Sequence, residues 1–122
     1  MDSMGHVNNT LYFRYLESAR LEYILRFDPQ RFGAGMILGS TSCKFIIPLT
    51  YPDTVTVTAK IVKLETYKAY MEQTIVSHKY QKVAAIGEAV LVGYDYKTLK
   101  KAPIAEEVRQ IMIDLDDPEI VD

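Results

Sequence analysis

The feature that most constrains this chain is one long apolar segment, residues 8–27, which no glycine or proline interrupts. Within it, apolar side chains recur at spacings of three and four, typical of one face of an α-helix: Tyr12, Leu16, Ala19, Tyr23 and Phe27. Further apolar residues widen this face, so we expect other structure to wrap the helix. Asn8 or Asn9 can cap its first turn, and Asp28-Pro29 ends it, because proline disfavours helical geometry in the preceding residue.

After position 35 the apolar residues alternate with polar ones, which indicates β-strands. The segments with this pattern are 37–47, 54–65, 69–80 and 83–94. The alternation slips at Ile61 and Val62, where we expect a β-bulge. Gln81 and Lys82 join the last two segments as in a hairpin, so the sheet should be antiparallel. The order of elements predicts the α+β class, with an antiparallel sheet curled around one helix.

The 122 residues suffice for one domain, with a core over about 1–103 and a C-terminal helix and acidic tail over 104–122. We expect a short helix at 105–113 and a frayed tail after it.

The balance of 14 Lys and Arg against 16 Asp and Glu gives a net charge of -2, and so provides no general attraction for nucleic acid or an anionic membrane. The single Cys43 cannot close an internal disulfide, and no Cys or His spacing resembles a metal site. No targeting signal is recognisable, so we expect a cytoplasmic location, or an organelle if a presequence precedes this sequence.

Residues 2–9 read Asp-Ser-Met-Gly-His-Val-Asn-Asn and run directly into the helix segment. They place the Asp2 carboxylate just before a helix N-terminus, where amides carry partial positive charge and lack helical partners. Gly5 permits close approach of a ligand, so nearby amides can polarise a carbonyl oxygen while Asp2 attacks the carbonyl carbon or activates water. The pattern suits acyl transfer to water. It also fits an ordinary turn and cap, in which His6 makes a structural hydrogen bond.

Residues 2–20, written Asp-x-x-Gly-His-Val-Asn-Asn-x-x-Tyr-x-x-Tyr-x-Glu-x-Ala-Arg, resemble the signature of the 4-hydroxybenzoyl-CoA thioesterase family of hotdog-fold proteins, which includes the YbgC-like acyl-CoA thioesterases. The resemblance continues to about Pro103. The later segments that carry it are Phe45-x-x-Pro48-Leu49, Tyr51-x-Asp53-Thr54-Val55-Thr56-Val57 and Gly87-Glu88-Ala89.

This resemblance implies a hotdog fold, in which a curved antiparallel sheet wraps a long helix and protomers pair edge to edge. It implies an acyl-CoA thioesterase that acts as a homodimer or homotetramer, with active sites at the protomer interface. Coenzyme A is then part of the substrate, and no cofactor, metal, nucleic acid or membrane is expected.

The resemblance also assigns roles to residues. The nucleophile or general base falls on Asp2, and the amide that polarises the carbonyl lies near Gly5 to Val7. Asn9 stands where some relatives carry a histidine, and His6 and Asn8 fix the loop. The complete expected set is Asp2, Gly5, His6 and Val7 as catalytic residues, Asn8, Asn9 and Tyr12 at the substrate, and Glu17 as a supporting or structural acid.

One departure keeps other functions open. Family members usually have a first strand before the aspartate, whereas this sequence starts one residue before Asp2. Without that strand a sheet edge is exposed, and a terminal ammonium beside Asp2 would weaken it as a base. The alternatives are a weak or inactive hotdog domain that binds acyl thioesters or only oligomerises, and a hydratase or dehydratase, which needs a better-placed Asp and His pair.

Overall fold

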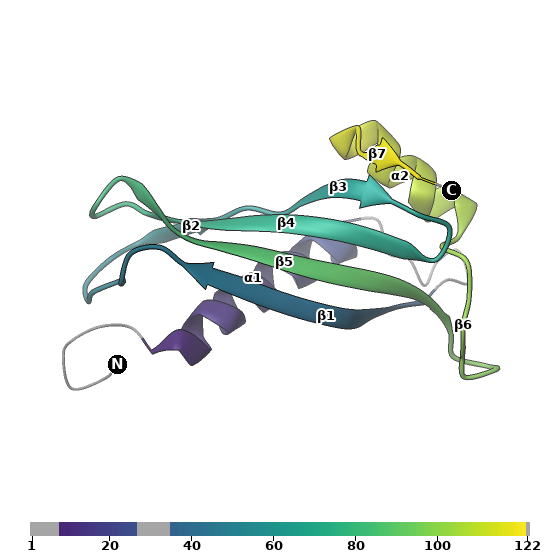
Figure 1. Ribbon diagram of the computed structural model, residues 1–122, viewed down its shortest axis with the longest axis horizontal. Coiled ribbons are helices and arrows are strands. Elements are labelled where there is room, and N and C mark those ends of the chain that lie inside the picture. The colour runs from purple at the N-terminus through teal and green to yellow at the C-terminus, as the bar shows by residue number, and fades with distance from the viewer. Residues whose placement is uncertain (1–7, 27–34, 122) are drawn as a thin grey trace.

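The computed structural model describes residues 8–26 and 35–121 (Figure 1). Two helices and seven strands occur in this part of the chain. In order they are α1 (Asn9–Leu25), β1 (Gly35–Phe45), β2 (Val55–Val57), β3 (Lys60–Leu64), β4 (Lys68–Ser77), β5 (Lys82–Asp95), β6 (Lys100–Lys101), α2 (Glu106–Asp116) and β7 (Glu119–Ile120).

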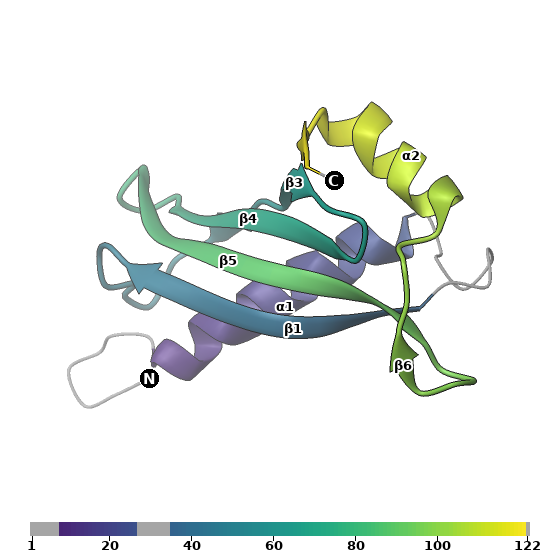
Figure 2. The same cartoon turned by 45° about the vertical axis from the view of Figure 1, so that its right-hand side comes forward.

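The strands form one sheet in the order β1-β5-β4-β3-β7, while β2 also pairs with β4 and β6 with β5. All pairs are antiparallel except β3 with β7, which is parallel. Figures 1 and 2 show α1 lying obliquely across one face of the sheet, while the other face stays open. The expected α+β architecture, an antiparallel sheet packed on one long helix, is confirmed.

Helix α1 begins as the sequence suggests but is covered on one side only. Of the two candidate caps, Asn8 is used: its side-chain oxygen accepts a hydrogen bond from the Thr10 amide at 2.8 Å. The buried residues of α1 are Tyr12, Leu16, Arg20 and Tyr23. The helix also exposes large apolar side chains, at Phe13, Leu21 and Leu25. These three side chains are left uncovered by the described chain. The expected stop at Asp28-Pro29 lies outside the described residues.

The core consists of two apolar clusters, one under each half of α1. The cluster near the start of the helix contains Tyr12, Leu16, Leu49, Ile75, Ala84 and Ala85. The larger one contains Tyr23, Ile61, Leu64, Ala69, Met71, Ala89, Leu91, Ile104, Val108 and Met112. Leu16 lies so close to Gly87 that a Cβ atom added at Gly87 would come within 2.8 Å of the Leu16 Cδ1 atom. Glycine at this position lets the helix approach the sheet closely.

The segment 54–65 is two strands, β2 and β3, rather than one. The register of β3 against β4 shifts between Ile61 and Lys63, so the predicted bulge is confirmed. The break between the two strands falls at Thr58 and Ala59, and the Thr58 amide still donates to the Thr74 carbonyl at 2.9 Å.

The C-terminal tail is ordered, which corrects the expectation that it frays. Helix α2 continues to Asp116, and β7 then pairs with β3. The Asp116 carboxylate accepts hydrogen bonds from the Tyr23 hydroxyl at 2.5 Å and from the Ile61 amide at 2.8 Å. This acid therefore ties α2 to both α1 and β3.

A second carboxylate fixes the loop between β1 and β2. Asp53 accepts hydrogen bonds from the Ser77 hydroxyl at 2.5 Å and from the amides of Thr54 and Lys79 at 2.6 and 2.9 Å. These bonds, with that of Ser77 foremost, lower the pKa of Asp53 below its usual range. The loop is thereby held to the turn between β4 and β5.

Replacing Asp116 with alanine should lower the free energy of unfolding by about 1–3 kcal/mol, because two partly buried donors lose their acceptor. Urea denaturation of the two proteins measures the difference. Asp114→Ala is the matched control, since Asp114 is exposed and accepts one bond from Gln110. Equal losses in the two variants would contradict this role of Asp116.

The Asp53 network predicts a pH dependence of stability. A carboxyl whose pKa is lowered on folding contributes stability above its unfolded pKa of about 3.9, and that contribution disappears as pH falls through the folded pKa. The stability difference between the wild type and Asp53→Asn should therefore shrink between about pH 6 and about pH 3. Urea denaturation across this range tests it, and a constant difference would show that the carboxylate charge has no part in the network.

Candidate active site

The predicted site lies at the N-terminal end of α1. Asp2, Gly5, His6 and Val7 are outside the described residues, so their roles stay predictions. The structure does define the surroundings into which residues 1–7 lead: the first turns of α1, the loop between β1 and β2, and the hairpin between β4 and β5, all at one end of the molecule (Figures 1 and 2).

The start of the helix is capped by Asn8 and carries no acidic side chain in its first turn. Asn8 has extended backbone angles, and its carbonyl accepts the Leu11 amide at 2.9 Å while its side chain caps Thr10. Asn9 begins the helix and is exposed. The first turn contains no acidic residue. A carboxylate or developing oxyanion near this end would therefore meet uncompensated positive charge from the helix amides.

Tyr12 joins the helix to the adjoining loop. Its ring is buried, and its hydroxyl accepts a hydrogen bond from the Leu49 amide at 2.7 Å and donates to the Ile47 carbonyl at 3.4 Å. Burial is the main cause that raises the pKa of this hydroxyl. The predicted substrate contact of Tyr12 stays a prediction, while its observed contacts position the loop.

Two half-exposed aromatic rings lie beside Tyr12 at the helix start. Phe45, at the end of β1, packs edge-on against Tyr12 with ring centres 5.0 Å apart and against Phe13 at 6.2 Å. Phe13 and Phe45 are 37% and 41% exposed, so the pair offers an apolar wall next to the candidate site. Sequence reasoning did not select Phe45 as a site residue, because its place in an alternating strand resembles core packing.

Glu17 lies one turn further along α1 and is exposed. Its charge acts on Arg20, whose pKa is lowered chiefly by burial and raised in part by this carboxylate. The Arg20 guanidinium donates to the Gln73 side chain at 3.2 Å, and Gln73 donates to the Leu16 carbonyl at 2.9 Å. Glu17 thus has an observed electrostatic partner within the helix, and the supporting role expected for it stays a prediction.

A serine, an aspartate and a histidine near the hairpin between β4 and β5 do not form a second catalytic site. Ser77, Asp53 and His78 are neighbours, but buried Ser77 donates directly to Asp53. The Nε2 atom of His78 is hydrogen-bonded to the Thr56 hydroxyl at 2.6 Å. These bonds fix the hairpin and do not form the serine, histidine and acid relay of nucleophilic catalysis.

The described chain offers neither a cluster of metal ligands nor a membrane-spanning helix. No group of three or more His, Cys, Asp or Glu residues in 8–26 and 35–121 is placed to hold a metal ion. No helix in the same residues is long and apolar enough to cross a membrane.

Comparison with known proteins assigns this sequence to a family. A sequence model of the thioesterase-like superfamily matches residues 1–112, a range that includes the predicted catalytic segment. None of the curated proteins matches the sequence.

Solved structures show the same fold. A thioesterase from Thermus thermophilus, complexed with coenzyme A and zinc, is 28% identical with a TM-score of 0.83, and the match covers 96% of this chain and 86% of that one. A thioesterase superfamily protein from Jannaschia sp. CCS1 is 22% identical with a TM-score of 0.87, over 99% and 79% of the two chains. The DHNA-CoA thioesterase of Staphylococcus aureus is 20% identical with a TM-score of 0.77, over 93% and 80%.

The sequence match and the shared fold agree with the resemblance that residues 2–20 carry. A sheet packed on one long helix is the fold that this chain shares with these thioesterase structures. This chain therefore belongs to the thioesterase-like superfamily.

Proposed function

We propose that this protein hydrolyses an acyl-CoA thioester to a free acid and coenzyme A. The observation that carries the proposal is the position of the sequence signature: Asp2 and Gly5 come directly before a capped helix whose first turn lacks acidic residues. Membership of the superfamily supports thioesterase activity, and the Thermus thermophilus relative supports coenzyme A as the carrier.

In the proposed reaction, Asp2 acts on the thioester carbonyl while amides near Gly5 to Val7 stabilise the negative charge on its oxygen. Asp2 either attacks the carbonyl carbon, giving an anhydride that water hydrolyses, or removes a proton from the attacking water. In both routes the C–S bond breaks, the hydroxyl of water goes to the acyl group, and a proton goes to the thiolate. Coenzyme A leaves as product, and we propose no separate cofactor.

The acyl group has an apolar wall available in Phe13 and Phe45. Both rings lie next to Tyr12 at the start of α1, so an acyl chain packed on them would leave its carbonyl near the helix amides. Polar groups on the acyl chain would lose solvation against this wall, which favours apolar or aromatic acyl groups.

We also propose that the protein works as a homodimer joined through β1, or as a homotetramer of such dimers. In the described sheet β1 has β5 as its one neighbour, which leaves its other edge unpaired. It is 11 residues long with Lys44 as its one charged residue, and Ile37, Leu38 and Phe45 are exposed. A long edge with little charge is a template for pairing with another chain. In an antiparallel pair of β1 strands, the start of the partner's β1 would lie beside Phe45 at the site.

The compartment proposed for this reaction is the cytoplasm. Cys43 is a free thiol in the structure, which suits a reducing compartment such as the cytoplasm. Burial raises its pKa, which reduces its reactivity.

Asp2→Asn tests the reaction. Release of thiol from a panel of short, long and aromatic acyl-CoAs should fall by about 100-fold or more, because an amide cannot act as base or nucleophile. Circular dichroism and thermal unfolding should be unchanged. Asp114→Asn serves as the control. Undiminished turnover by Asp2→Asn would refute this assignment, and a folded wild type without turnover would favour the binding or oligomerising alternative.

Charges on the β1 edge test the dimer. The wild type should sediment with two or four times the 13.9 kDa mass of the chain. Ser40→Lys with Ser42→Lys should shift it towards the monomer, because the symmetric edge would bring like charges together. Thr98→Lys, in the turn after β5, is the control and should leave the mass unchanged. A wild type that stays monomeric at every concentration would disprove pairing through this edge.

A further inference from the structure

The side of the sheet turned away from α1 carries more apolar residues than a strand face in water usually does. On β5 the buried residues, which pack in the core, alternate with outward residues, and four of these five are aliphatic or aromatic: Ile86, Glu88, Val90, Val92 and Tyr94. An antiparallel sheet with one face in water normally carries polar residues there. Neither helix of the described chain lies over this side of the sheet (Figures 1 and 2). We call this side, formed by the outward residues of β1, β3, β4 and β5, the open face.

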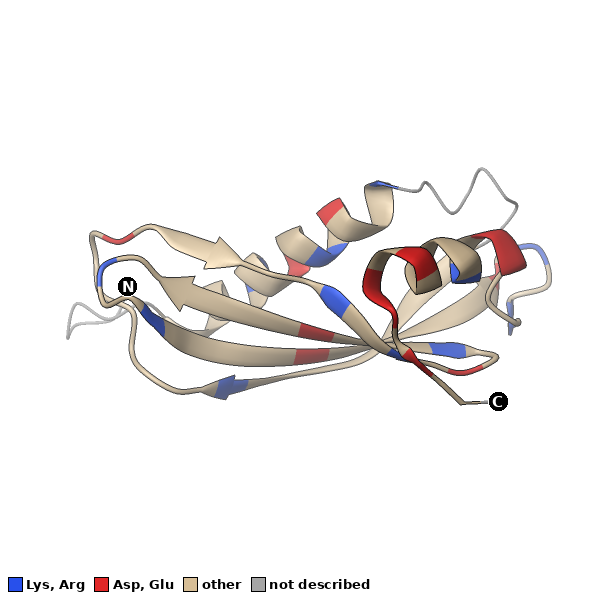
Figure 3. Ribbon diagram, turned by 90° about the horizontal axis from the view of Figure 1, so that it is seen from above, with Lys and Arg blue, Asp and Glu red and all other residues tan. Residues whose placement is uncertain are grey.

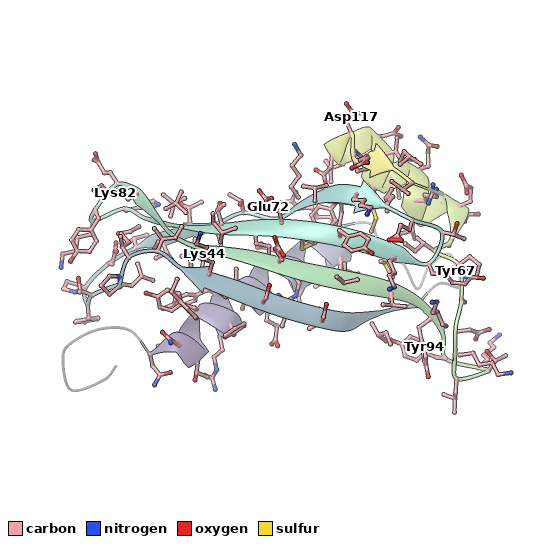
Figure 4. The ribbon with its side chains drawn as sticks, viewed as in Figure 1. Lys44, Tyr67, Glu72, Lys82, Tyr94 and Asp117 are labelled. Atoms are coloured by element: carbon pink, nitrogen blue, oxygen red, sulfur yellow. The ribbon has the colours of Figure 1, made fainter. Side chains whose placement is uncertain are left out.

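Two glutamates lie side by side in the middle of the open face. Glu72 on β4 is the register partner of Glu88 on β5, and both are exposed. Figure 3 shows two acidic positions next to each other in the middle of the sheet, and Figure 4 shows Glu72 there. Like charges directly opposite each other destabilise a sheet, and no ion pair within the described residues offsets them. The pair therefore attracts positive charge to this place.

Lysines lie on both sides of this acidic pair. On β1, Lys44 is opposite an outward residue of β5 (Figure 4). On β3, Lys60 is the register partner of Glu72. Lys63 pairs with Tyr70, and its ammonium lies 4.9 Å from the centre of the Tyr70 ring. With acids in the middle and lysines towards its edges, the open face is complementary in charge to a second copy of itself turned about a two-fold axis.

The open face is also hollowed where these charges lie. A cavity of about 340 Å³ over β3, β4 and β5 has Lys63, Tyr70, Glu72, Glu88 and Val90 among its lining residues. A side chain of a facing copy that enters this cavity would meet carboxylates and apolar groups together. Buried apolar contacts with charged residues around them are the composition of a protein interface.

We propose that the open face packs against the open face of a second copy of this chain. The inference is independent of the thioesterase reaction and adds a second interface to the pairing proposed for the β1 edge. Because the open face and the β1 edge are different surfaces, both contacts can form at once. Together they join four chains, as two edge-paired dimers with their sheets face to face.

The exposed side of α1 is the other apolar surface that a second dimer could cover. Leu21 and Leu25 there are 53% and 72% exposed. A dimer packed on α1 would lie beside Phe13 and restrict the approach to the candidate active site. Packing through the open face leaves the helices on the outside and that approach free. The unpaired glutamates also have their complementary lysines on the open face, so the observations favour it over α1.

Sedimentation of matched variants tests this contact. The wild type should have four times the 13.9 kDa mass of the chain. Val90→Glu should have twice that mass, because a third carboxylate beside Glu72 and Glu88 would lose its solvation in the contact. Leu21→Glu, the same kind of change on the exposed side of α1, is the control and should keep four chains. Circular dichroism and thermal unfolding check that both variants fold.

The charges of the open face are tested separately. In Glu72→Gln with Glu88→Gln, the dissociation constant of the four-chain assembly should rise by about 10-fold and depend less on salt, because lysines of the facing copy lose their partners. If the two glutamates only repel each other within one chain, their removal would leave this constant unchanged or lower it. That result would overturn the proposed pairing of charges.

The masses also separate this inference from the other proposals. Loss of the four-chain assembly in Leu21→Glu but not in Val90→Glu would assign the contact to α1 and overturn the inference, as would a wild type that never exceeds two chains and that Val90→Glu leaves unchanged. A two-chain wild type that Val90→Glu separates would support the open face and refute pairing through β1. All masses are measured without substrate, so a wild type that hydrolyses no thioester would refute only the proposed function.

Discussion

The close approach of Leu16 to Gly87 is the contact on which the rest of the structure depends. Because no side chain stands at position 87, α1 can lie directly on β5 at the middle of the sheet. An alanine there would place its Cβ atom within 2.8 Å of the Leu16 side chain, so the end of that side chain would have to shift. At the closer distance, hydroxyls at both ends of the helix reach their partners, Tyr12 in the loop before β2 and Tyr23 at Asp116 of α2. The helix packed on the sheet is thus hydrogen-bonded at both ends, to the loop before β2 and to α2.

The centre of this helix interface is polar, although both neighbouring clusters are apolar. Arg20 is buried at 7% exposure against Gln73, which also bonds to the Leu16 carbonyl. A buried guanidinium with a neutral partner is costly, and the Glu17 charge three residues earlier offsets part of that cost. The Gln73 side chain is held in place because both the oxygen and the nitrogen of its amide are hydrogen-bonded to α1. This pair fixes the position of α1 along β4 more specifically than apolar packing can.

Local sequence signals predicted the elements, and long-range contacts decided what the prediction missed. The helix period, the Asn8 cap, the alternation of the strands and the bulge near Ile61 all depend on residues close in sequence. Arg20 is buried against Gln73, 53 positions away, so the local helix pattern carries no signal for its burial. The tail order depends on Asp116 meeting Tyr23, 93 positions away. At the candidate site the sequence supplied the signature at positions 2–9, whereas the wall residue Phe45 emerged only from the fold.

Two of the apolar side chains that this fold leaves exposed lie next to the helix start. Phe13 and Phe45 share one ring contact and are both half exposed, at the end of β1 whose edge has no neighbour in the described sheet. Covering that edge with another chain would remove water from these rings and from the helix amides together. In the drier site, the amide dipoles would act more strongly on a thioester carbonyl. If the proposed dimer forms through this edge, assembly would thus be coupled to the proposed chemistry, because covering the edge would strengthen the electrostatic stabilisation of the thioester carbonyl.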